Sequence, residues 1–237
     1  MPDPITSTAP PPAQQDETRS VVKAAGVIGA ATFSSRVLGF VRDMVLARLF
    51  GATPAADAFF VAFRIPSLLR ELFAEGSMSS AFIPVFTEYR TMRSKQETWE
   101  LASAVFTTLL TVVTFVTIVG ILAAPWLVQL LAPGFQEHPD KLALTTLLAR
   151  VMFPYLLFVS LAALAMGILN SVRAFAAPAF SPLFLNIFII IGALFVSPQL
   201  PEPIVGVAIG VVAGGAAQFA MQLHLSGAAL YDGGALG

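Results

Sequence analysis

The chain has 237 residues, of which 57% are hydrophobic and 11% are charged, against about 25% charged in an ordinary soluble domain. A mean hydropathy of +0.81 indicates an integral membrane protein. The formal net charge of −1 gives no reason to expect a nucleic-acid partner. The absence of cysteine excludes disulfides, thiolate metal sites and cysteine catalysis. The two histidines are not spaced as metal ligands, so we expect no metal, no cofactor and no catalytic set.

Residues 1–21 differ from the rest of the chain, because they are rich in Pro, Thr, Ser and Gln. Such a segment cannot bury enough apolar surface to fold, and we expect a disordered cytoplasmic tail. It lacks the basic start, short apolar core and small-residue cleavage site of a signal peptide.

Apolar helical segments fill residues 22–224, and about 20 apolar residues are enough to cross a membrane. The second segment is too long for a simple span and contains Pro66, Gly76 and Pro84, so we expect a bent helix that continues past the membrane. The pattern predicts an all-α polytopic membrane helix bundle with about six transmembrane helices. Their expected ranges are 22–51, 57–90, 101–132, 142–172, 178–198 and 203–224.

The last residues, 225–237, have neither a basic flank nor an apolar helical pattern. This atypical tail is compatible with a natural C-terminus or with a point at which a longer protein was truncated.

Basic residues in the connections predict the orientation. Lys141 is the one basic residue of the connections on one side, in the loop near 133–141. By the positive-inside rule, the N-terminus is cytoplasmic and the turns near 52–56, 133–141 and 199–203 face outward. Arg48, close to the outer end of the first helix, is a mild exception. The basic residues on the other side are Arg19, Lys23, Arg90, Arg93, Lys95 and Arg173.

Charged residues inside the first two helices are the strongest functional signal. A charge at bilayer depth costs at least a few kcal/mol, so it normally faces a bundle interior or an aqueous cavity. A surplus of guanidinium groups in such a cavity favours an anionic, pyrophosphate-bearing substrate. These residues are Arg36, Arg42, Arg48, Arg64 and Arg70, with Asp43, Asp57, Glu71 and Glu75.

Helical periodicity places Arg36 and Asp43 on one face of the first helix, while Arg42 and Arg48 each point about 120° away from Arg36. A bend at Gly39 would bring Arg36 and Arg42 into one cavity, and the sequence leaves this open. We interpret Asp43 as paired with a partner on a neighbouring helix, and Arg48 as reaching the outer interface.

On the second helix Asp57, Arg64, Glu71 and Glu75 share a face, and Arg70 lies off it. We expect Arg36, Arg42 and Arg70 to bind substrate. Glu71 is more consistent with a structural pair. Arg150, which stands alone in the fourth segment, is more consistent with a structural role.

The same region resembles a known family. The first of four matching stretches is the most specific, because its SRVLGF-RD, ADAFFVAF and FAEG elements occur together. The stretches resemble, in order, members of the MurJ (MviN) family of bacterial lipid II flippases, over roughly residues 22–222. They are FSSRVLGFVRDMVLARLFGATPAADAFFVAFRIPSLLRELFAEGSMSSAFIPVFTEY (33–89), APGF (132–135), FPYLLFVSLAALAMGILNS (153–171) and PAFSPLFLNI (178–187).

The resemblance implies one lobe of a MOP-superfamily transporter, whose members have two six-helix lobes around a cationic cavity. It implies movement of lipid II from the inner to the outer leaflet of the bacterial plasma membrane by alternating access. Arg36, Arg42 and Arg70 match the essential cavity charges of the family, and Asp57 and Glu75 match its gating or charge-balancing acids.

Only the first lobe is present, so the expected partners are lipid II, membrane lipids and a missing C-terminal lobe or second polypeptide. Three other functions remain open from the residues alone. They are a flippase for another lipid-linked oligosaccharide, a drug exporter of the same superfamily and a non-transporting membrane scaffold.

Overall fold

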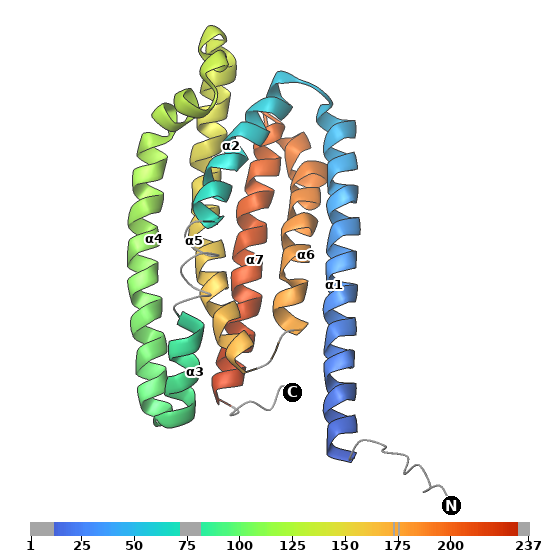
Figure 1. Ribbon diagram of the computed structural model, residues 1–237. Helices are drawn as coiled ribbons and strands as arrows, with labels where there is room; N and C mark the ends of the chain where they lie inside the picture. Colours follow the sequence, from blue (N-terminus) through green and yellow to red (C-terminus); the bar gives the residue numbers. More distant parts are fainter. Residues whose placement is uncertain (1–11, 72–81, 173, 175, 232–237) are drawn as a thin grey trace, which may run out of the picture.

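The computed structural model describes residues 12–71, 82–172, 174 and 176–231, and within them the chain is a bundle of seven α-helices without strands (Figure 1). The predicted all-α fold is therefore confirmed. A 3-10 turn, η3 (Pro133–Glu137), connects α4 to α5, and a π turn, η4 (Gly192–Val196), with a 3-10 turn, η5 (Ser197–Gln199), connects α6 to α7. The helices are α1 (Pro12–Phe50), α2 (Pro54–Arg70), α3 (Ile83–Met92), α4 (Lys95–Leu131), α5 (Pro139–Ser171), α6 (Ala176–Ile191) and α7 (Ile204–Tyr231).

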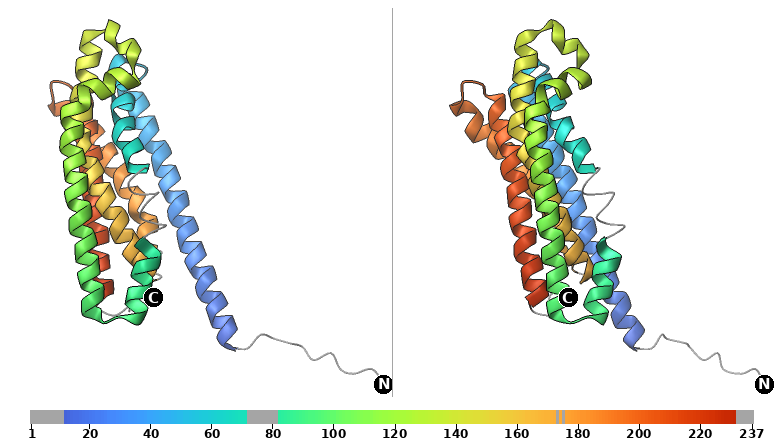
Figure 2. Two further views of the ribbon diagram at one scale, coloured as in Figure 1. Left: turned by 60° about the vertical axis from the view of Figure 1, so that its left-hand side comes forward. Right: turned by 90° about the vertical axis from the view of Figure 1, so that its left-hand side faces the viewer.

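Helix α5 forms the centre of the bundle. It packs against α7, α2 and α4, while α6 packs between α7 and α1. The most apolar stretch of α5 is 72% buried, whereas that of α4 is only 17% buried. Figure 2 shows α4 and α1 at the two outer sides of the bundle. The main core therefore lies around α5, and α1 is attached mainly through α6.

Four helical stretches of the described chain are long and apolar enough to cross a membrane: α4, α5, residues 179–199 and α7. The exposed face of α4 carries large apolar side chains such as Phe115 and Leu122, which suits contact with lipid. The two tryptophans of the chain, Trp99 and Trp126, are both exposed and lie near opposite ends of α4. Their separation of about 40 Å along a helix matches a bilayer with its interfaces, where tryptophan is enriched.

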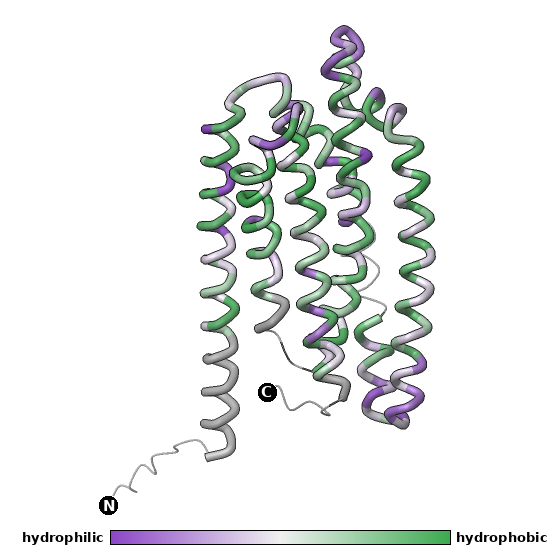
Figure 3. The backbone as a smooth tube through the Cα atoms, turned by 180° about the vertical axis from the view of Figure 1, so that it is seen from behind, coloured by the Kyte–Doolittle hydropathy of each residue, from purple (hydrophilic) through white to green (hydrophobic). Residues whose placement is uncertain are grey.

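The structure groups the interhelical connections at the two ends of the bundle as the sequence predicted. The α1–α2 turn, η3 and η5 lie at one end, and the α3–α4 turn lies at the other (Figure 1). Figure 3 shows hydrophilic residues concentrated at these ends and in the upper part of α1.

Three predicted boundaries differ from the structure. Helix α1 begins at Pro12, so residues 12–21 belong to a helix and not to the expected tail. Proline is favoured in a first helical turn, and the following Ala, Gln and Glu are good helix formers. Helix α7 runs to Tyr231, so residues 225–231 are also helical. The predicted helix 57–90 appears as α2 and α3, on either side of residues 72–81, which lie outside the described residues.

The short α1–α2 connection sets the charged ends of these helices side by side. Gly51 ends α1 with a φ of +56°, and its N–H donates to the Ala47 carbonyl at 2.9 Å. A left-handed residue of this kind is a common helix terminator, and glycine adopts it without strain. Thr53 then caps α2 by accepting the Ala56 N–H at 3.4 Å, and Pro54 occupies the first turn.

Helices α6 and α7 approach closely at Gly210. A Cβ atom at this position would lie 2.5 Å from the carbonyl oxygen of Phe188 and 3.0 Å from the Cα of Ile189. Small residues let helix backbones touch in this way within a membrane protein. This contact fixes α6, and through α6 the position of α1.

We predict that Gly210→Ala destabilises the protein by about 1–3 kcal/mol, because the added methyl group overpacks the α6–α7 contact. Thermal unfolding of the detergent-solubilised chain measures the effect. Gly29→Ala is the matched control, because nothing lies within 4 Å of a Cβ there. Equal melting temperatures for the two variants would contradict the close contact.

Candidate functional site

Arg42 lies at the junction of α1 and α6, where its guanidinium has polar partners on both helices. Its Nε and Nη2 donate to the Asp43 Oδ1 at 2.9 Å and 2.8 Å. Its Nη1 donates to the Asn186 Oδ1 at 2.9 Å. The Arg42 side chain is 27% exposed, against 59% for Asp43. The prediction that Asp43 pairs with a neighbouring helix is therefore wrong, because the long arginine side chain folds back to the adjacent carboxylate.

A hollow of ≈ 340 Å³ opens beside this pair, between the end of α1 and the start of α2. Arg42 and Asp43 are its charged lining residues, and Phe59 and Phe60 line the opposite wall from α2. A guanidinium at the edge of an apolar hollow can bind an anionic group more strongly than the same group in water, since the local dielectric is lower. This hollow is the best candidate site for a phosphate group in the described chain.

Arg36 occupies a different place on α1. The helix runs unbroken through Gly39, so the bend that would unite Arg36 and Arg42 is not observed. Arg36 is exposed, whereas Arg42 faces α6. The Arg36 side chain is thus open to a ligand or to a further part of the protein.

Arg70 is half-buried in the last turn of α2. At 1.5 Å per helical residue, Arg36 on α1 and Arg70 on α2 each lie about 20–25 Å along their helix from the α1–α2 turn. The two residues are therefore at similar distances from this end of the bundle. Arg64, in α2, and Glu71, directly after α2, are both exposed. Glu75, the second predicted gating acid, lies outside the described residues.

Asp57 sits in the first turn of α2, at the end of the bundle that the sequence predicts to face outward. Its Oδ2 accepts a hydrogen bond from the Lys141 Nζ at 2.8 Å, in an ion pair between the starts of α2 and α5. The Lys141 ammonium also lies 4.1 Å from the ring centroid of Phe135 in η3. This pair ties three elements together at one mouth of the bundle.

Two residues that were not among the predicted site residues, Asn186 and Lys141, form hydrogen bonds with Arg42 and Asp57. Lys141 had a visible signal, as the one basic residue of the loops on the predicted outer side. Asn186 had a weaker one, as a single amide in the apolar segment 178–198. Arg150 donates from its Nε to the Ile121 carbonyl of α4 at 3.3 Å, in keeping with its structural interpretation.

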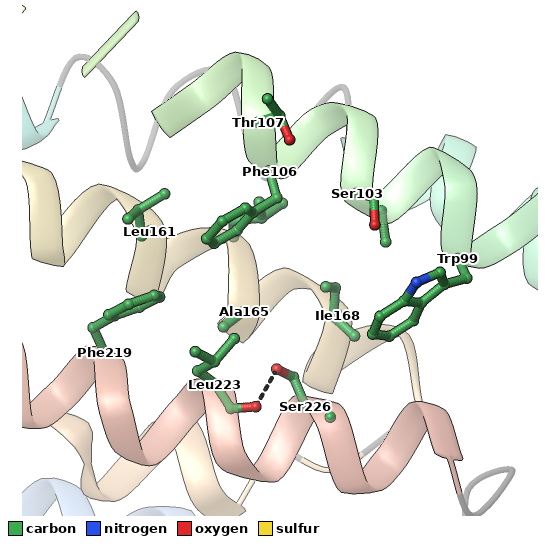
Figure 4. Close-up of a pocket in the computed structure, with 13 residues that line it drawn as sticks. Trp99, Ser103, Phe106, Thr107, Leu161, Ala165, Ile168, Phe219, Leu223 and Ser226 are labelled. Atoms are coloured by element: carbon green, nitrogen blue, oxygen red, sulfur yellow. Dashed lines mark hydrogen bonds between the residues drawn. The ribbon is translucent and has the colours of Figure 1, made fainter. Parts of the chain in front are cut away.

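A second pocket, of ≈ 230 Å³, lies between α4, α5 and α7 (Figure 4). Its walls are mostly apolar, with Phe106 and Phe219 stacked at a centroid distance of 6.4 Å. The hydroxyl of Ser226 in this pocket donates to the Leu223 carbonyl at 3.0 Å. None of the described residues that line this pocket is charged, so the described lining is unsuited to a phosphate headgroup. Within the described residues, His, Asp and Glu side chains form no group of three that could hold a metal ion.

Comparison with known proteins places the chain in a family. The family model described as "Lipid II flippase MurJ" matches residues 46–229. The lipid II flippase MurJ of Burkholderia cenocepacia is 41% identical over 196 residues, which are 83% of this chain and 38% of that protein.

A solved structure of lipid II flippase MurJ in an inward closed conformation superimposes with a TM-score of 0.72 at 30% identity. The match covers 83% of this chain and 41% of the solved chain. The chain therefore spans about two fifths of the length of the relatives it matches. With these helices, motifs and matches in agreement, the chain belongs to the MurJ family of multi-pass membrane proteins.

Proposed function

We propose that this chain forms the pyrophosphate-binding wall of a lipid II flippase, which moves the lipid-linked peptidoglycan precursor across the bacterial plasma membrane. The observation that carries the proposal is the Arg42 guanidinium, held between α1 and α6 at the edge of the ≈ 340 Å³ hollow. Arg36, Arg42 and Arg70 are the proposed substrate-binding residues. The proposed role is in transport, without catalysis of a chemical reaction.

Alternating access requires a second wall that moves relative to this one. Relatives with the family name are more than twice as long as the matched region, since that region covers 38% of the Burkholderia cenocepacia protein. We therefore infer that the substrate path is completed by a C-terminal lobe, in the same polypeptide or in another one. The exposed Arg36 would be accessible to such a lobe.

A chimeric transporter tests this function. The 196-residue matching segment of the Burkholderia cenocepacia protein is replaced by that of this chain, in a strain whose own copy can be switched off. We expect rescue of growth by the chimera, no rescue by Arg36→Ala or Arg42→Ala, and weak rescue by Arg42→Lys, which keeps the charge but loses the bidentate fork.

Arg48→Ala is the control for this series, because Arg48 is an exposed arginine of the same helix without a proposed substrate role. Immunoblots of membranes confirm equal protein levels. Full rescue by Arg42→Ala would exclude the proposed site. Rescue that survives removal of all three arginines would favour a non-transporting membrane scaffold. Competition of a multidrug cation with the transported substrate would favour a drug exporter.

We propose a cytoplasmic N-terminus from the distribution of basic residues. The chain lacks cysteine, so single introduced cysteines can test this orientation. Single cysteines at Gln136, in η3, and at Ser94, before α4, occupy exposed positions at opposite ends of the bundle. We expect a membrane-impermeant maleimide to label Gln136→Cys in intact cells, and Ser94→Cys only after permeabilisation. The reverse pattern would place the N-terminus outside.

Asp57 and Glu75 are proposed as gating or charge-balancing acids. The Asp57 side chain is 60% exposed, so its ion pair with Lys141 is expected to contribute at most about 1 kcal/mol to stability. An interaction of this size can hold a closed state and still open during a transport cycle. The pair is thus suited to a gate and contributes little to the overall stability.

We predict that a double-mutant cycle of Asp57→Asn and Lys141→Met in thermal unfolding gives a coupling energy below about 1 kcal/mol. In the chimera, either single substitution should slow transport while the protein level stays unchanged. Asp140→Asn, an exposed acid beside Lys141, is the control and should behave like the parent. A large coupling energy without any effect on transport would identify the pair as purely structural.

A further inference from the structure

Asn186 is a buried amide on an otherwise apolar helix. Its side chain is 6% exposed, and α6 has the sequence AAPAFSPLFLNIFIII, in which Ser181 is the other polar residue. A buried amide is destabilising unless its oxygen and nitrogen both find partners. Asn186 must therefore be hydrogen-bonded on both sides to be tolerated here.

The amide of Asn186 meets this condition by bridging two points of α1. Its Oδ1 accepts from the Arg42 Nη1 at 2.9 Å, and its Nδ2 donates to the Ser35 carbonyl at 3.2 Å. A guanidinium can only donate and a carbonyl can only accept, so the two partners fix the orientation of the amide. A carboxylate could replace the first contact but not the second.

The helical register explains why one side chain reaches both partners. Ser35 and Arg42 are seven residues apart, which brings them to nearly the same face of α1, two turns from each other. Gly39 lies between them, and a Cβ atom there would lie 3.7 Å from the Asn186 Nδ2. The amide thus lies directly against the α1 backbone. This contact is central to the attachment of α1, which packs mainly against α6.

The contacts of Arg42 leave a defined set of donors. A guanidinium has five N–H groups, and three of them are used: two by Asp43 and one by Asn186. The other two, one on each terminal nitrogen, have no partner among the described residues, and Arg42 lines the ≈ 340 Å³ hollow. A pair of N–H groups on the two terminal nitrogens suits two oxygens of a phosphate.

We propose that Asn186 is a positioning residue, which holds the Arg42 guanidinium so that its two remaining N–H groups are presented to a phosphate in the α1–α2 hollow. Holding a flexible arginine before the ligand arrives reduces the entropy that binding must overcome. The inference rests on the proposed function for its ligand, and the geometry of Asn186 itself is independent of it.

Arginine modification tests the positioning directly. The 237-residue chain is placed in lipid nanodiscs and treated with phenylglyoxal, and the rate at each arginine is followed by mass spectrometry of peptides. In Asn186→Leu we expect Arg42 to react faster by on the order of tenfold, because a hydrogen bond to a charged group is lost. Asn186→Asp retains the acceptor, so Arg42 should stay as slow as in the parent chain.

Two controls separate positioning from general loosening. Arg36 and Arg48 are exposed on the same helix and should react at unchanged rates in every variant. Gln218→Leu removes another buried amide, whose Nε2 donates to the Ser181 carbonyl of α6 at 2.8 Å, and should leave Arg42 unchanged. An Arg42 rate that does not respond to Asn186→Leu would overturn the proposal, as would an equal rise at all three arginines.

A ligand-protection experiment tests the positioning role of Asn186 separately from the proposed function. Undecaprenyl pyrophosphate should protect Arg42 of the parent chain, and Asn186→Leu should need about tenfold more of it for the same protection, in line with one weakened charged contact. Protection of both chains at the same concentration would overturn the positioning role. Faster modification in Asn186→Leu without protection of the parent would support the positioning of Arg42 and reject the pyrophosphate ligand.

Discussion

A charged side chain within a bilayer needs a polar partner or water, and this constraint organises the whole bundle. The apolar helices α4 to α7 and the core around α5 carry few charges, and Arg150 of α5 bonds a backbone carbonyl of α4. The remaining intramembrane charges are concentrated on α1 and α2. The fold therefore separates a lipid-facing side at α4 from a charged side at α1 and α2 (Figure 3).

The charged groups of α1 and α2 with described side-chain contacts are paired either with an adjacent residue or with a residue from another helix. Arg42 is shared between Asp43 and Asn186, and Asp57 is paired with Lys141. The two ion pairs are partly exposed, so each contributes modestly to stability. The exposed pair of Asp57 with Lys141 can consequently open to water without unfolding the bundle.

The mechanical arrangement follows from the packing. Close contact at Gly210 fixes α6 against α7, and the Asn186 amide fixes α1 against α6. Helix α1 has no comparable contact with α4 or α5 among the described helices. An anionic ligand that binds Arg42 would therefore act on the one main attachment of α1 to the rest of this lobe.

Much of the fold follows from the sequence, because length, hydropathy and helix-breaking residues act locally. The ranges of α4 and α5 and the start of α7 were predictable from apolar length. A turn near 52–56 was also predicted, and membership of a flippase family could be inferred from the motif-rich stretch 33–89. The boundaries at Pro12 and Tyr231 were not predicted, because polar or glycine-containing ends of long helices lack an apolar signal.

By itself, the sequence determined that this is a helical membrane protein whose first two segments carry arginines and acids. Only the tertiary structure decided how these charges are arranged. Periodicity on one helix cannot reveal that Asn186, 144 residues away, meets Arg42, or that Lys141, 84 residues away, meets Asp57. Those pairs arise from the packing of α6 on α1 and of α5 on α2, because partner choice in a bundle depends on which helix faces meet.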